Sequence, residues 1–213
     1  MRYLPPVLGV LVVIASIACA APVTELFNGR DFTGWEFVTT PAVAITEVCH
    51  LQPDGSIAVT GKPVGFIATT PAYENYQLHA EWRWPDQPGN SGVLIHISSG
   101  PKDRAWPVCI QIQLKNKNVG DVLPMAGAAF AEKPSTPPEA KTAILNRTAP
   151  DSEKPVGEWN SCDLTCRGDI LEVTINGVVQ NKVTQLRPHS GRIGFQLEGI
   201  PFELRRVSVV RLD

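Results

Sequence analysis

The sequence has no excess of charge of one sign. Its 213 residues contain 19 lysines and arginines against 21 aspartates and glutamates, for a formal net charge of −2. Proteins that hold nucleic acid or anionic membranes electrostatically carry a basic surplus. The composition therefore gives no electrostatic case for either partner, and we expect no nucleic-acid partner.

Long apolar runs are also missing, except near the start. Arg2 supplies a short positive region, Val7–Ala15 is apolar, and Ala18-Cys19-Ala20 has the small residues of an export cleavage site. The apolar run is too short to span a bilayer comfortably. We predict a signal peptide over residues 1–20 and a single mature domain over residues 21–213. The mature domain has no transmembrane span and is expected in the periplasm or cell envelope.

Lipidation is the alternative interpretation of the same segment. Cleavage before Cys19 would leave a cysteine that can carry a lipid anchor. Ser16 stands where such a signal normally has a larger aliphatic residue. Plain export is therefore preferred, and an envelope lipoprotein anchored through Cys19 is the second interpretation.

Metal-binding cysteine and histidine motifs are absent. No Cys-x-x-Cys or His-x-x-x-His spacing occurs, which argues against a zinc site. Four cysteines follow the signal, and an exported protein could pair them in disulfides. Cys162 and Cys166 lie on one predicted strand about 13 Å apart, too far to bond to each other. Cys49 and Cys109 complete the set; the pairing stays open, and four small core residues are the alternative.

Helical periodicity is weak, whereas turn residues are abundant, with 19 prolines and 17 glycines. This pattern indicates an all-β protein of short strands joined by turns. Asn176-Gly177 favours a tight hairpin turn, and Pro53-Asp54-Gly55 favours another turn. The predicted strands are a first strand entered at Gly34-Trp35, then Val43–Leu51, Ser56–Thr60, Tyr76–Trp84, Ser91–Ser98, Cys109–Lys115, Ile170–Ile175, Val178–Val183, Arg192–Leu197 and Phe202–Leu212.

The strand Cys109–Lys115 alternates strictly. Ile110, Ile112 and Leu114 form one face, which we expect to be buried, and the other face carries Cys109, Gln111, Gln113 and Lys115. We expect that second face to be open. Its amides and amine can grip hydroxyl-rich ligands through directional hydrogen bonds, although a solvated face is the simpler alternative for one strand alone.

Other polar strand faces carry residues that can do chemistry. Glu81 and Arg83 share one face, with a cross-strand ion pair as the alternative to ligand binding. His96 faces away from Val93, Ile95 and Ile97 if alternation is strict, although a lone histidine is more often structural.

Residues at strand ends extend this set. Gln196 and Glu198 share a polar face, with a solvated strand end as the alternative. Asn90 either binds a ligand or begins a turn, and Trp106 either stacks on a sugar or packs in the core.

The segment Asn116–Gly157 has six prolines and no sustained period. Long irregular segments are usually functional or mobile. Because this one follows the amide-bearing strand, it is well placed to cover whatever that strand binds; an idle surface excursion is the alternative. Within it, Ala126–Glu132 could form one or two helical turns.

Six sequence blocks stand out in order: Leu26–Trp35, Gly89–Val93, Trp106–Lys115 with Gly120-Asp121, Gly157–Asn160, Ile175–Val178 and Ser190–Gln196. Together they resemble the 3-keto-disaccharide hydrolase domain family over residues 25–212. The resemblance implies an all-β, concanavalin A-like jelly roll of two antiparallel sheets with a concave sugar-facing groove. It also implies cleavage of the glycosidic bond of 3-keto-glycosides.

One residue departs from that family. Gln111 stands where its members usually carry a glutamate, and an amide cannot act as a general base. The same strand argues against ordinary glucan hydrolysis, because retaining glucanases need two carboxylates about 5 Å apart, commonly on one strand, and Gln111-x-Gln113 offers none.

The implied reaction assigns provisional roles. A ketone at C3 acidifies the C2 proton, so that a base near C2 and an electrophile on the ketone oxygen expel the group at C1. We expect His96 or Glu198 to act as base or acid. Lys115 and Gln113 are expected to polarise or orient the sugar oxygens. A divalent metal could replace Lys115 as electrophile, no other cofactor is implied, and a partner sugar 3-oxidoreductase would supply the substrate.

Two other classes of function remain open. A non-catalytic carbohydrate-binding or lectin-like domain uses the same fold and is favoured by Gln111. A structural envelope protein would leave the polar faces without a ligand.

Overall fold

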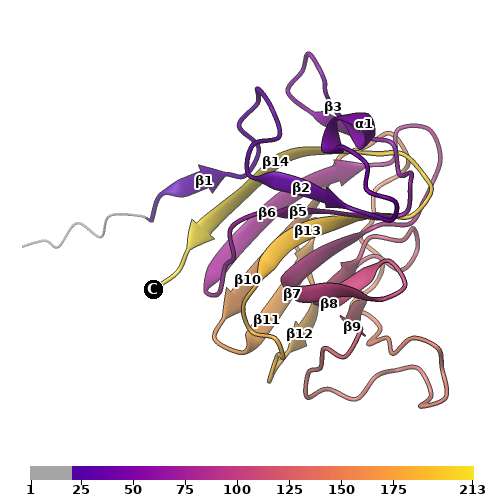
Figure 1. Cartoon of the computed structure of the whole chain (residues 1–213). Coiled ribbons are helices and arrows are strands. Elements are labelled where there is room, and N and C mark those ends of the chain that lie inside the picture. The colour runs from indigo at the N-terminus through magenta and orange to yellow at the C-terminus, as the bar shows by residue number, and fades with distance from the viewer. Residues whose placement is uncertain (1–20) are drawn as a thin grey trace, which may run out of the picture.

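The alternating segments form two antiparallel sheets that pack face to face (Figure 1). The computed structural model describes residues 21–213. The predicted signal peptide, including Cys19, lies outside the described residues. Within residues 21–213, no helix is long and apolar enough to cross a membrane.

The first sheet has eight strands in the order β12-β11-β10-β6-β14-β4-β3, with β1 paired to β14. The Asn176-Gly177 turn joins β11 to β12 as the sequence predicts. The strands are β1 (Val23–Glu25), β3 (Cys49–Leu51), β4 (Ile57–Val59), β6 (Tyr76–Arg83), β10 (Asn160–Arg167), β11 (Ile170–Ile175), β12 (Val178–Val183) and β14 (Phe202–Arg211).

The second sheet has six strands in the order β2-β5-β13-β7-β8-β9. Its two central strands, β13 and β7, come from distant parts of the chain, so this sheet gathers motifs that lie far apart in the sequence. The strands are β2 (Trp35–Val38), β5 (Gly65–Thr69), β7 (Gly92–Asp103), β8 (Trp106–Gln113), β9 (Val122–Met125) and β13 (Arg192–Leu197).

The main core lies between the two sheets. Ile110, Ile112 and Leu114 are buried in it, as the alternation of their strand predicts. The opposite face of the same strand is not open, because Gln111 and Gln113 are only 2% and 8% exposed. The expectation that this strand is buried on one side only is therefore wrong.

A second apolar cluster explains that burial. It lies on the outer face of the six-stranded sheet and includes Phe66, Leu94, Trp106, Cys109 and Met125. Apolar neighbours on adjacent strands flank the glutamines, so only part of this face is polar.

Two local predictions differ from the structure. The segment Val43–Leu51 begins with one helical turn, α1 (Ile45–Val48), in which Glu47 accepts a hydrogen bond from the Ala44 N–H. Ala126–Glu132 forms no helix. Its backbone bonds to a distant segment instead, with the Ala129 N–H donating to the Arg187 carbonyl.

The irregular segment after β8 is anchored at several points. It contributes β9, and Leu145 pairs with Val122 through two backbone hydrogen bonds. Glu132 accepts hydrogen bonds from the Thr184 N–H and hydroxyl. The irregular segment extends from the edge of the six-stranded sheet that β9 forms (Figure 1). From this edge it can form a wall over the outer face of the sheet.

The four cysteines of residues 21–213 are free and buried. Cys162 and Cys166 belong to β10 and both face the core. Burial raises the thiol pKa of all four, that of Cys49 to about 12. They are small packing residues in this structure.

Candidate functional site

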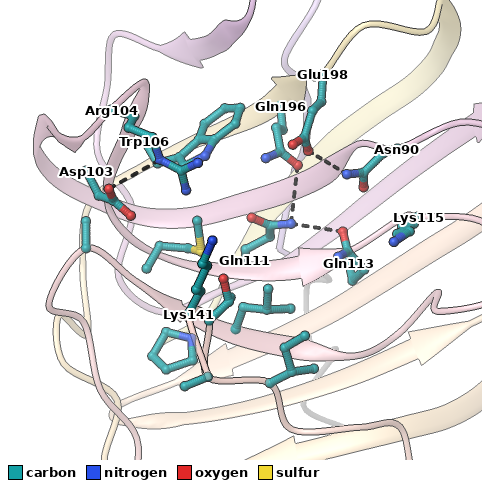
Figure 2. Close-up of a pocket in the computed structure, with 17 residues that line it drawn as sticks. Asn90, Asp103, Arg104, Trp106, Gln111, Gln113, Lys115, Lys141, Gln196 and Glu198 are labelled. Atoms are coloured by element: carbon teal, nitrogen blue, oxygen red, sulfur yellow. Dashed lines mark hydrogen bonds and ion pairs between the residues drawn. The ribbon is translucent and has the colours of Figure 1, made fainter. Parts of the chain in front are cut away.

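A cavity of about 260 Å³ opens on the outer face of the six-stranded sheet. Strands β7, β8, β9 and β13 form its floor, and residues 141–144 of the anchored segment line it as well (Figure 2). Seven residues predicted for the site lie in this cavity: Asn90, Trp106, Gln111, Gln113, Lys115, Gln196 and Glu198.

Three glutamines form the floor and are joined by hydrogen bonds (Figure 2). The Gln111 Nε2 group donates to Gln113 Oε1 at 2.9 Å and to Gln196 Oε1 at 3.3 Å. Gln111 Oε1 is buried without a hydrogen-bond partner. The floor thus offers the free amide hydrogens of Gln113 and Gln196, which can donate to the oxygen atoms of a hydroxyl-rich ligand.

Gly92 makes this arrangement possible. It lies on β7 opposite Gln113, and a Cβ at this position would lie 2.8 Å from the Cγ and Nε2 atoms of Gln111. Real Cβ contacts are not that short, so the Gln111 side chain can cross β7 toward Gln196 only over a glycine. The preceding residue, Ser91, links β7 to the adjacent strand β13, because its hydroxyl group donates to the backbone carbonyl oxygen of Gln196 at 2.7 Å.

One end of the cavity contains the carboxylate of Glu198, with Asn90 and Lys115 beside it. The Asn90 Nδ2 group donates to Glu198 Oε2 at 2.6 Å. The antiparallel register of β7 and β8 continues past the strands, since the Asn116 N–H donates to the Gly89 carbonyl at 3.1 Å, and this sets Asn90 opposite Lys115. Asn90 Oδ1 is buried and has no partner.

Burial raises the pKa of the Glu198 carboxyl group above its usual value. The positive charges of Lys115 and Arg104 and the Asn90 hydrogen bond act in the opposite direction but do not cancel it. A carboxylate with a raised pKa is a stronger base when ionised and a ready acid when protonated.

The other end of the cavity is lined by apolar side chains and by two cationic ones. Trp106 packs in the outer apolar cluster with Met125 and also lines the cavity. Arg104 lies beside Trp106, and its Nε atom is 3.5 Å from Asp103 Oδ1 (Figure 2). Lys141 comes from the anchored segment and points toward the glutamine floor in the same view.

His96 does not lie in this cavity, and the prediction that it shares a face with the glutamines is wrong. Its φ of 54° accompanies an irregularity in the pairing of β7 with β8, which shifts the alternation of the strand. Ile97 consequently joins the outer cluster, whereas the His96 ring packs edge-on against Tyr76 of the main core, with ring centroids 5.8 Å apart.

The surroundings of His96 are those of a core residue. It is fully buried, and Nδ1 lies 3.2 Å from the Pro188 carbonyl oxygen. A carbonyl only accepts, so Nδ1 carries the proton. Burial lowers the pKa of the imidazole to about 4, which keeps the ring neutral near pH 7.

Glu81 and Arg83 also lie elsewhere, which corrects the expectation that they line the site. They are on the outer face of the eight-stranded sheet, on the far side of the main core from the cavity. Glu81 pairs with Arg205 and Arg206, and Arg83 pairs with Glu203. These are the cross-strand ion pairs that the sequence offered as the alternative.

Several cavity residues escape sequence reasoning. Arg104 and Asp103 lie at the β7–β8 turn, beside the predicted Trp106, but nothing in the sequence indicates that this turn faces the glutamines. Lys141 lies in the segment predicted to cover the amide strand. Its position within that segment depends on the path of the chain, for which no local signal exists.

The donor set of the cavity is poor in metal-ligating groups. Its carboxylates are Glu198 and Asp103, at opposite ends (Figure 2). Residues 21–213 contain no group of three or more His, Cys, Asp or Glu side chains that could hold a metal ion.

Comparison with known proteins supports the resemblance found in the sequence. Residues 22–210 match the family described as 3-keto-alpha-glucoside-1,2-lyase-like domain. A search of curated proteins gives no match.

Solved structures that share the fold include three of different kinds. A protein from Parabacteroides distasonis, provisionally assigned as a glycosyl hydrolase, is 23% identical, with 90% of this chain and 94% of that chain covered and a TM-score of 0.66. The carbohydrate-binding module CBM66 from Bacillus subtilis is 12% identical, with 84% and 96% covered and a TM-score of 0.58. The β-glucanase of Bacillus licheniformis is 10% identical, with 92% and 100% covered and a TM-score of 0.53. Together with the two antiparallel sheets, these neighbours confirm the predicted jelly-roll fold.

Proposed function

Because the chain belongs to the family of 3-keto-alpha-glucoside-1,2-lyase-like domains, we propose that its cavity cleaves the glycosidic bond of 3-keto-glycosides by elimination. The observation that carries the proposal is the half-buried Glu198 carboxylate, which Asn90 orients and Lys115 adjoins, at one end of a glutamine-floored cavity.

Glu198 is the base in this proposal. The ketone at C3 acidifies the hydrogen on C2, and the carboxylate takes that proton. Its raised pKa favours the transfer, because a base is most effective when its pKa approaches the working pH. The Asn90 hydrogen bond fixes the direction of one carboxylate oxygen, which leaves the other for the substrate.

Lys115 and the amides stabilise the resulting enolate. When C2 loses its proton, negative charge moves to the oxygen on C3. The Lys115 ammonium group lies at this end of the cavity, and its positive charge can stabilise the negative charge on that oxygen. The free amide groups of Gln113 and Gln196 bind the remaining hydroxyls and hold the ring against Glu198.

The departing oxygen on C1 also needs a proton. The cavity's other carboxylate, Asp103, is at the far end and pairs with Arg104. We therefore assign both proton transfers to Glu198: it accepts the C2 proton and returns it to the leaving oxygen as the C1–O bond breaks. The products are the free alcohol and an enone, a 2-hydroxy-3-oxo-glycal, and later addition of water to the enone makes the net reaction a hydrolysis.

Substitution of the carboxylate tests this function. Glu198→Gln keeps the shape of the side chain, and we expect turnover of 3-keto-glycosides to fall about 10²–10⁴-fold. His96→Ala is the control. We expect it to lower stability by about 1–3 kcal/mol, because it removes a buried ring and its hydrogen bond. Its turnover, measured well below the unfolding temperature, is expected to stay near that of the natural protein.

The measurement is release of the alcohol from a panel of 3-keto-glucosides, with and without added divalent cation. The function is refuted if no member of the panel is cleaved, and the role of Glu198 is refuted if Glu198→Gln retains full activity. A low rate in His96→Ala, in protein shown to be folded, would contradict the placement of His96 outside the site.

A sugar-binding domain without catalysis is the second candidate. Gln111, at the centre of the floor, favours it, because an amide stands where the family's usual glutamate would supply a carboxylate. A protein of this kind would bind 3-keto-glycosides without consuming them, and calorimetry with analysis of the recovered ligand separates the two functions.

The proposal extends to location and supply. Export through residues 1–20 would place the cavity where glycosides enter the cell envelope, and a sugar 3-oxidoreductase would have to make the ketone. Cell fractionation of the full-length protein tests the first part; finding it in the cytoplasm at full length would refute export.

A further inference from the structure

The proposed reaction uses one end of the cavity and leaves the other unassigned. Glu198, Asn90 and Lys115 lie at one end, whereas Arg104 and Trp106 lie across Gln111 from them (Figure 2). If C1 and C2 of the sugar face Glu198, the group attached to C1 can extend along the cavity toward the second end. The properties of that end therefore determine which leaving group fits.

Apolar side chains line the second end. Trp106, Leu123 and Met125 belong to the outer apolar cluster and contribute to the cavity surface. They cover β8 and the neighbouring β9, so their positions are held by the sheet rather than by a loop. Such a surface fits the flat or apolar body of a leaving group, which a sugar ring or an aromatic ring offers.

Two cations border this apolar surface. Lys141 is exposed, and no carboxylate of residues 21–213 lies within 4.0 Å of its ammonium group. The Arg104 and Asp103 side chains are 78% and 56% exposed, and pairs this exposed contribute little. Arg104 can therefore bind a second anion at small cost.

The cavity has more positively than negatively charged side chains, and this local excess does not follow from the composition of the chain. The whole chain has a net charge of −2, yet this cavity gathers Arg104, Lys115 and Lys141 against Glu198 and Asp103. Lys115 is accounted for by its position beside Glu198. Arg104 and Lys141 come from two separate segments and both line the cavity, and the proposed reaction gives neither of them a role.

We infer that the leaving group carries a carboxylate, which Arg104 and Lys141 bind while Trp106 contacts the body of the group. The inference rests on the proposed function and adds the substrate class: 3-keto-glycosides of acidic alcohols. The carboxylate can belong to an aromatic acid or to a uronic acid sugar, and both present the same planar anion to a guanidinium and an ammonium group.

Matched substrates test the inference. One pair is phenyl and 4-carboxyphenyl 3-keto-glucoside, and the other has glucose or glucuronate as the leaving sugar. For at least one pair we expect the acidic member to have about tenfold higher kcat/KM, because charge-assisted hydrogen bonds favour it. The advantage is expected to shrink as salt is raised. The pair that shows it identifies the source of the carboxylate.

Variants locate the effect. Lys141→Met and Arg104→Met should each reduce the ratio of kcat/KM for the acidic substrate to kcat/KM for its neutral partner about threefold or more. The ratio is the readout because loss of the Arg104 charge also changes the pKa of Glu198, which affects both substrates. Lys133→Met is the matched control, since Lys133 lies in the same segment but does not line this cavity. An equal rate for acidic and neutral members of both pairs would overturn the inference, as would a preference that persists in both variants.

A binding measurement separates this inference from the proposed function. 4-Hydroxybenzoate and glucuronate are titrated against the natural protein by calorimetry, with 4-hydroxybenzamide and glucose as neutral counterparts. Binding of either acid that is lost in Lys141→Met supports the carboxylate site even if no 3-keto-glycoside is cleaved. Cleavage of neutral substrates without binding of either acid supports the function and refutes the carboxylate site.

Discussion

At the scale of single residues, the site depends on what surrounds each polar group. Gln111 reaches Gln196 because Gly92 has no side chain to obstruct it. Glu198 has a raised pKa because it is half-buried, although Lys115 limits the rise. His96 has a lowered pKa because the main core encloses it. Residue type alone distinguishes none of these states.

The pH dependence of catalysis should reveal the link between Lys115 and Glu198. A base must be ionised, so kcat/KM should rise with pH through the raised pKa of Glu198. Lys115→Met removes a positive charge that lowers this pKa. The acidic limb of the profile is therefore expected to move to higher pH, in addition to any loss of rate. The measurement is kcat/KM against pH for the natural protein and the variant.

Lys117→Met is the control for that shift, because Lys117 does not line the cavity. Its acidic limb should coincide with that of the natural protein. A limb that stays in place in Lys115→Met would show that another group titrates in the profile.

At the scale of elements, the irregular segment is a fixed wall rather than a free loop. Glu132 receives three hydrogen-bond contacts from Thr184. Glu153 receives hydrogen bonds from the Trp84 and Asn116 side chains and from the Lys117 N–H. These anchors hold both ends of the stretch that carries Lys141 to the cavity.

Loosening one anchor should weaken substrate binding more than chemistry. Glu132→Gln replaces charge-assisted hydrogen bonds, which contribute about 1.5–3 kcal/mol each, with weaker neutral ones. We expect faster hydrogen exchange at Ala129 and Ala131, whose amides bond to distant carbonyls, and a severalfold higher KM with little change in kcat. Glu139→Gln, an exposed change in the same segment, should alter neither quantity. Unchanged exchange in Glu132→Gln would contradict the anchoring role.

At the scale of the whole molecule, stability and function occupy opposite faces of the same sheet. The main core lies between the two sheets, and the cavity lies on the outer face of the six-stranded sheet. Neighbouring residues of β8 therefore serve different purposes, because successive side chains on a strand point to opposite faces.

Two substitutions on β8 should separate these purposes. Ile110→Ala leaves a void in the main core and should lower the free energy of unfolding by about 2–5 kcal/mol, with kcat unchanged in folded protein. Gln113→Ala removes a group from the cavity floor; we expect activity to fall and stability to change by about 1 kcal/mol. Chemical denaturation and steady-state kinetics at one temperature measure both. Equal effects of the two variants on stability would argue against this division.

The sequence by itself determined most of the elements and, where the alternation is unbroken, the side of each that faces the core. Alternation is a local property, so the pattern around Ile110 predicts which residues face the core, and Asn176-Gly177 predicts the hairpin from two residues. The ordered motifs likewise identify the family and, through it, the jelly roll.

Only the tertiary structure decided which polar residues meet. Alternation places polar side chains outward on both sheets, and strand pairing between distant segments assigns Glu81 to one outer face and Gln111 to the other. A backbone irregularity at His96 reverses the expected side of that residue. The path of a segment without periodicity brings Lys141 to the cavity. Each of these outcomes depends on contacts between residues far apart in the chain, which no local pattern encodes.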